Sequence, residues 1–146
     1  MAFTNTGSTA ILNGLIGKSS SGPLSSCYLA LSSTTPNQDG TNFTEPSSTA
    51  GYARAVVGLS SQSATQVMNS PVNGTTQNKE IIFFPEASAS WGTLTHFGLY
   101  SAANGGNLIL YGALSSPITV AANYVPLFRA GNFSLTLTCL LYTSPS

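Results

Sequence analysis

The sequence contains little charge. Only 5% of its 146 residues are charged, with four basic side chains, four acidic side chains and a formal net charge of zero. Soluble domains usually carry about 25% charged residues. The even balance leaves no basic surface for a phosphate backbone, so we expect no nucleic-acid partner. A neutral surface also has little repulsion between copies, which favours a homo-oligomer, or a place inside a larger assembly, over a dilute monomer.

Cysteine and long hydrophobic runs are also scarce. The two cysteines, Cys27 and Cys139, are too few for a disulfide framework and lack the spacing of a metal site. Cys27 is expected to be a small buried hydrophobe. No apolar run reaches the roughly 20 residues needed to span a bilayer, and the N-terminus does not resemble a secretory signal peptide. We therefore expect synthesis in a cytosol and no membrane insertion.

The hydrophobic pattern predicts one short helix near the N-terminus. Apolar side chains recur at helical spacing within residues 6–16, and Gly17 is a natural stop. A linker rich in Ser, Gly and Pro follows at residues 19–23.

Most of the remaining chain has the composition of β-strands. The clearest signal is a hairpin over residues 91–114, in which two strands rich in aromatic and branched residues flank a Gly-rich turn. Residues 133–138 alternate apolar and hydroxyl side chains, as in a strand with one buried face. Further strands are predicted at 27–31, 52–57 and 80–84, together with a weaker pair formed by 118–120 and 125–128.

About seven or eight short strands with little helix predict an all-β fold, either an antiparallel β-sandwich or a jelly-roll-like domain. We expect this single domain to cover residues 1–138. A long loop at residues 34–51 contains several Pro and Gly residues, and residues 60–78 are polar and predict no clear element. Loops longer than about 15 residues are usually functional or mobile.

His96 is the only histidine. It could be a general base, oriented by one of the carboxylates Asp39, Glu45, Glu80 and Glu86, with a hydroxyl as nucleophile. No spacing selects such a set. The favoured interpretation is a half-buried ring on a strand, bonded to a neighbouring hydroxyl or carbonyl. We therefore expect no catalytic residues and no enzymatic activity.

The sequence also predicts no metal site and no cofactor. A single histidine leaves transition metals without their usual ligands. The oxygens of Asn37, Gln38, Asp39 and Glu45 could bind Ca²⁺, but the Asp-x-Asp-x-Asp pattern is missing. Residues 17–19 read Gly-Lys-Ser, like the end of a phosphate-binding loop, yet they follow a predicted helix where that loop follows a strand.

Two arginines leave two interpretations open. Arg54 and Arg129 could point outward as charges that discourage strand pairing at a sheet edge. They could instead pair with Glu80 or Glu86 across a protomer interface. The aromatic side chains are expected mostly in the core, while an exposed subset could stack on sugars or anchor an oligomer.

Several segments together resemble a family of small tailed-bacteriophage virion proteins, often labelled tail fibre proteins. The most specific segment is Trp-Gly-Thr-Leu-Thr-His-Phe-Gly at residues 91–98, and the others are 28–36, 44–54, 82–85 and 106–114. The resemblance covers the chain to about residue 138. It implies a non-enzymatic virion component without catalytic residues.

Residues 139–146 depart from this family, whose members tend to end near residue 138. Their sequence is similar to a translated sequencing adapter, so we expect a non-native or disordered tail. For the whole chain we expect a structural virion protein, a tail fibre or tail-associated part that self-assembles or docks onto the particle. The alternatives are a capsid decoration protein, or a host-glycan-binding module that uses the loop 34–51.

Overall fold

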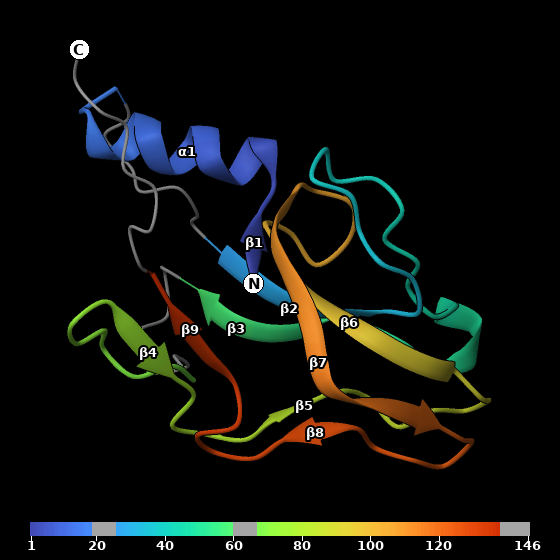
Figure 1. Cartoon of the computed structure of the whole chain (residues 1–146). Helices are drawn as coiled ribbons and strands as arrows, with labels where there is room; N and C mark the ends of the chain where they lie inside the picture. Colours follow the sequence, from blue (N-terminus) through green and yellow to red (C-terminus); the bar gives the residue numbers. More distant parts are fainter. Residues whose placement is uncertain (19–25, 60–66, 138–146) are drawn as a thin grey trace.

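The computed structural model describes residues 1–18, 26–59 and 67–137 (Figure 1). The predicted linker at 19–23 and the tail at 139–146 lie outside these residues. No helix within the described ranges is long and apolar enough to cross a membrane. In chain order the elements are β1 (Ala2–Phe3), α1 (Asn5–Leu15), β2 (Ser26–Ser32), a 3₁₀ turn (Ser48–Ala50), β3 (Ala55–Leu59), β4 (Thr75–Gln77), β5 (Ile82–Phe83), β6 (Gly92–Tyr100), β7 (Leu108–Val120), β8 (Leu127–Phe128) and β9 (Ser134–Thr136).

The largest element is a five-stranded sheet in the order β1-β7-β6-β2-β3, in which every neighbouring pair is antiparallel. The predicted hairpin is confirmed as β6 and β7, with Leu99 opposite Leu110. The turn between them places Gly105 and Gly106 at positive φ, which glycine adopts without steric cost. This hairpin forms the middle of the sheet.

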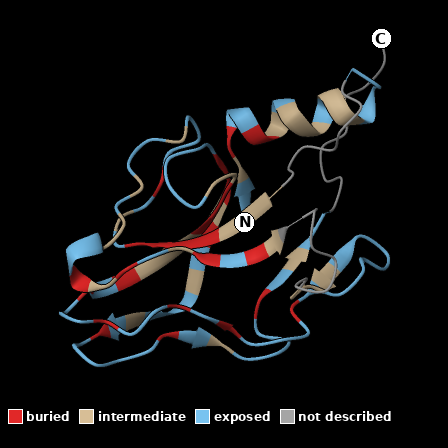
Figure 2. Ribbon diagram, turned by 180° about the vertical axis from the view of Figure 1, so that it is seen from behind, coloured by how far each residue is buried: buried red, intermediate tan, exposed pale blue. Residues whose placement is uncertain are grey.

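The second layer consists of two small sheets, β4–β9 and β5–β8. Their inner side chains, among them Ile82, Phe84 and Phe133, join one core cluster with Leu29 and Leu31 of β2. Figure 2 shows buried positions along the large sheet and in the segments that lead into and out of the small strands facing it. The fold is therefore the predicted all-β sandwich, with its second layer divided into two parts.

One predicted strand pair is wrong. Residues 118–120 do not pair with 125–128, because β7 continues through Pro117 and Ile118 lies opposite Leu94 of β6. The register shifts at this point, which accommodates the proline within a long strand. The β8 residues pair instead with β5, from a different part of the chain.

The N-terminal helix α1 confirms the prediction for residues 6–16 within one residue at each end. Thr4 caps it, since its hydroxyl accepts from the Gly7 N–H and donates to the backbone carbonyls of β7. A Cβ at Gly7 would lie 2.2 Å from the Ile109 carbonyl oxygen, so only glycine permits this close approach. The first turn anchors the helix, while Leu15 near its end is 77% exposed.

Trp91 closes one end of the core. Its ring is buried, and its indole N–H donates to the Ala50 carbonyl at 2.8 Å. The ring meets Tyr52 edge to face, with 5.2 Å between ring centroids. The end of the 34–51 loop is thereby held against the sandwich.

Candidate functional site

His96 lies on β6 and is half-buried, as the structural interpretation predicted. Its Nδ1 lies 2.8 Å from the hydroxyl of the adjacent Thr95. This is the only hydrogen bond of the imidazole within the described residues, and it does not involve a carboxylate. The hypothesis of a general base oriented by an acid therefore has no geometric support.

A polar cluster forms instead around Arg54, which precedes β3. The Arg54 side chain is 7% exposed and binds Glu45 through both carboxylate oxygens, with Nη2 to Oε2 at 2.8 Å and Nε to Oε1 at 2.9 Å. Tyr52 donates its hydroxyl to Glu45 Oε1 at 2.7 Å and accepts from the Leu31 N–H at 3.2 Å. Two neutral groups and one ion pair thus satisfy one another in the interior.

The same guanidinium reaches the turn between β6 and β7. Its Nη1 donates to the carbonyls of Ala102 at 2.8 Å and Gly105 at 2.7 Å. The guanidinium carbon Cζ of Arg54 lies 3.6 Å from the centroid of the Tyr100 ring, in cation–π contact. Arg54 therefore connects the 34–51 loop, the start of β3 and the hairpin turn; we call these contacts the Arg54 cluster.

These contacts shift the proton affinity of the cluster. Burial raises the pKa of Tyr52, and the charge of Glu45 raises it further. Burial also raises the pKa of Tyr100. Burial opposes the charge on Arg54, but the hydrogen bond and charge of Glu45 outweigh it, so the pKa of Arg54 is raised. The arginine therefore remains charged at physiological pH.

The cluster corrects both sequence interpretations of Arg54. Its side chain does not point outward, and its partner is Glu45 of the same chain rather than Glu80 or Glu86. The signal was present in the sequence: Tyr52 and Arg54 are two residues apart, so an extended backbone places both side chains on one face.

The carboxylates considered for a Ca²⁺ site already have protein partners. Both oxygens of Glu45 are occupied by Arg54, while Asp39 accepts hydrogen bonds from the N–H and hydroxyl of Thr41. Within residues 1–18, 26–59 and 67–137, no three His, Cys, Asp or Glu side chains gather as a metal site would require. Cys27 is half-buried and burial raises the pKa of its thiol to about 12, in line with a packing role.

Next to the Arg54 cluster is a shallow depression of about 280 Å³, lined by Glu45, Pro46, Ser48, Tyr52 and the turn residues 103–105. The loop 34–51 presents no exposed aromatic ring there. Its one aromatic, Phe43, packs edge to face on Tyr100 at 5.3 Å between ring centroids and is partly buried. Beside the depression, the carboxylate of this loop is therefore already hydrogen-bonded to Tyr52 and Arg54.

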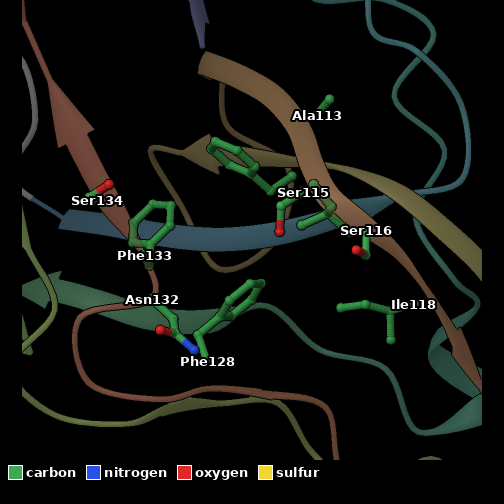
Figure 3. Close-up of a pocket in the computed structure, with 10 residues that line it drawn as sticks. Ala113, Ser115, Ser116, Ile118, Phe128, Asn132, Phe133 and Ser134 are labelled. Carbon is green, nitrogen blue, oxygen red and sulfur yellow. The ribbon is translucent and has the colours of Figure 1, made fainter.

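A second opening, of about 240 Å³, lies between β7 and the segment that leads from β8 to β9. Figure 3 shows Phe128 and Phe133 on one side and Ser115, Ser116 and Ile118 of β7 on the other. The two phenylalanine rings are 6.2 Å apart between centroids, and no charged side chain lines the opening. We call this opening the phenylalanine groove.

One family of known proteins matches the chain over almost all of the residues that the structure describes. The family model Gp80, described as podophage GP4 fiber I protein gp80, matches residues 2–136. No curated protein matches the chain.

Proposed function

Because the chain belongs to the family of podophage GP4 fiber I protein gp80, we propose that it is a structural part of a phage tail fibre that acts by self-assembly or by docking onto the particle. The match over residues 2–136 carries this proposal, since it includes both layers of the sandwich. The family makes the chain a virion component.

The physical properties of the surface support assembly into a homo-oligomer. The chain carries 5% charged residues and no net charge, so copies repel one another weakly. Large apolar side chains are exposed on several elements, including Leu15, Phe83 and Leu127. Interfaces of permanent assemblies are depleted in charge in the same way.

The same family also supports a non-enzymatic role. The residues that the sequence offered for catalysis are engaged otherwise: His96 bonds Thr95, and Glu45 bonds Arg54 and Tyr52. Both arrangements engage these side chains within the protein and support a structural rather than a catalytic role.

The location in the particle is tested by labelling. We expect antibodies against this chain to mark the tail fibres in electron micrographs of purified particles of its phage. Labelling of the head would favour the capsid-decoration alternative and contradict the fibre proposal. Light scattering of the purified protein should give a mass well above 15.0 kDa, and a stable monomer at high concentration would contradict self-assembly.

Binding of host-surface glycans is a second candidate function. The lining of the phenylalanine groove favours the groove over the loop 34–51 as its site. The groove combines the partly exposed Phe128 ring with Ser and Asn side chains and lacks charge, which suits a neutral sugar. We expect a glycan array to give signals that disappear in Phe128→Ala and persist when loop residue Thr41 is changed to Ala. A blank array would contradict this function.

A further inference from the structure

The β5–β8 sheet has an apolar outer face that the core does not use. Along residues 81–85 the side chains alternate between exposed and buried, and so do residues 125–127, with odd-numbered positions outside. Phe83 lies directly opposite Leu127, with Ile81 and Val125 beside them on the same face. We call Ile81, Phe83, Val125 and Leu127 the outer patch.

We propose that the outer patch binds the outer patch of a second copy of this chain, in a contact with two-fold symmetry. The inference rests on the proposed self-assembly and names its surface. Two-fold contacts place one surface against itself, and they are the most common arrangement among homo-oligomers.

The area of the patch suits the centre of such a contact. Phe83 is 66% exposed, Ile81 47%, and Val125 and Leu127 each 41%. Together these side chains expose roughly 350 Å², which lies within the usual range for the largest apolar patch of a monomer. Two patches in contact would bury about 700 Å², so the charged residues at the two ends of the patch have to complete the interface.

Charge at the two ends of the patch suits the same arrangement. Lys79, Glu80 and Arg129 lie at one end, with a net charge of +1, and Glu86 lies beyond Phe83 at the other; all four side chains are exposed. In the described part of the chain, the only ion pair joins Arg54 to Glu45. A two-fold axis across the strands reverses the second patch, so Arg129 of each copy comes beside Glu86 of the other. The centre of the interface carries no charge, so the two copies do not repel each other there.

The exposed face of α1 provides a contrast. Leu12, Leu15 and Ile16 are also exposed, but they span one turn near the end of a helix that is anchored by its first turn. Figure 1 places α1 at the opposite end of the molecule from β5 and β8. Leu15 is therefore a matched control, an exposed apolar residue remote from the outer patch.

The first experiment measures mass by light scattering over a dilution series of the full chain. Wild-type protein is expected at twice 15.0 kDa or more. The double variant Phe83→Ser, Leu127→Ser is expected at half the wild-type mass or less, while Leu15→Ser keeps the wild-type mass. A double variant that retains the wild-type mass would overturn the proposal, while the self-assembly of the protein would stand on another surface.

The second experiment tests the symmetry by charge reversal, which leaves the apolar residues intact. Arg129→Glu alone brings acid beside acid and should raise the dissociation constant at least about fivefold. Adding Glu86→Arg should restore the wild-type constant, because the pair is then reversed in both copies. A double variant as weak as Arg129→Glu would overturn the two-fold arrangement. A wild-type protein that stays at 15.0 kDa at high concentration would overturn self-assembly itself.

Discussion

The Arg54 cluster and the outer patch are opposite in where they place charge and apolar surface. The cluster brings an ion pair inside and satisfies both partners with carbonyl, hydroxyl and aromatic groups. The outer patch brings aromatic and branched side chains out to solvent. Among four basic and four acidic residues, one pair is used to join three segments, and apolar surface is left where another molecule can cover it.

This difference separates stability from assembly. Changes in the cluster should weaken the folded chain without altering how copies associate. Changes in the outer patch should do the reverse.

The largest effect on stability is expected for Glu45→Ala. It leaves the Arg54 guanidinium buried without its counter-charge and should lower the free energy of unfolding by about 3 kcal/mol. Urea unfolding followed by circular dichroism measures this loss. The double variant Glu45→Leu, Arg54→Met should recover most of it, since apolar replacement of a buried pair is often neutral. A loss under about 1 kcal/mol for Glu45→Ala would mean that the pair is no stronger than a surface ion pair. The Arg54 cluster would then not differ from the outer patch in its effect on stability.

A smaller loss is expected for Tyr52→Phe. The hydroxyl is the acceptor for the buried Leu31 N–H and a donor to Glu45, so its removal should cost about 2 kcal/mol. Tyr124→Phe is the matched control, because Tyr124 is 48% exposed and should change stability by less than about 0.5 kcal/mol. Equal losses in both variants would show that the Tyr52 hydroxyl does not support the cluster.

The cluster should also make stability depend on alkaline pH. Burial raises the pKa values of Tyr52 and Tyr100 in the folded chain, whereas in the unfolded chain a phenol ionises near pH 10. The unfolded state therefore releases its protons first, so stability is fully present below about pH 9 and falls as the pH rises above 10. Each phenol contributes a slope of up to about 1.4 kcal/mol per pH unit.

Unfolding midpoints measured across this pH range test the slope. Tyr52→Phe should make the decline shallower, because one of the two protons no longer contributes. An unchanged slope in this variant would assign the alkaline loss to other groups.

The smallest effect on stability is expected in the outer patch. Phe83→Ser removes an exposed ring and should change the unfolding free energy of the dissociated chain by less than about 0.5 kcal/mol. Urea unfolding at a concentration below the dissociation constant gives this value. A loss above about 1 kcal/mol would mean that the ring supports the fold of the single chain. The outer patch would then contribute to stability as the Arg54 cluster does.

The sequence was sufficient for the elements whose signals are local. The helix, the β6–β7 hairpin and the half-buried His96 follow from periodicity, Gly-rich turns and alternation within a few residues. The second layer was harder to predict, because β5 and β8 have two residues each and too few positions for a clear period. Their pairing depends on contacts between distant parts of the chain.

The Arg54 cluster shows the same limit. Arg54 was visible as a charge in an apolar segment, but its carbonyl partners lie about fifty residues away in the turn after β6. The continuation of β7 through Pro117 was likewise not predicted, since prolines within sheets are confined mostly to edges and bulges, and here the strand continues through a shift in register. Neither the carbonyl partners of Arg54 nor the register shift near Pro117 produces a periodic pattern in the sequence.

Trp91, the only tryptophan of the chain, gives the protein an internal optical reporter. Its indole is 6% exposed and hydrogen-bonded to Ala50, within the core and remote from solvent. Its fluorescence maximum should stay at short wavelength when dilution separates the copies, and it should move to long wavelength only when denaturant opens the core. One emission spectrum therefore distinguishes a dissociated chain from an unfolded one, without any added dye or tag.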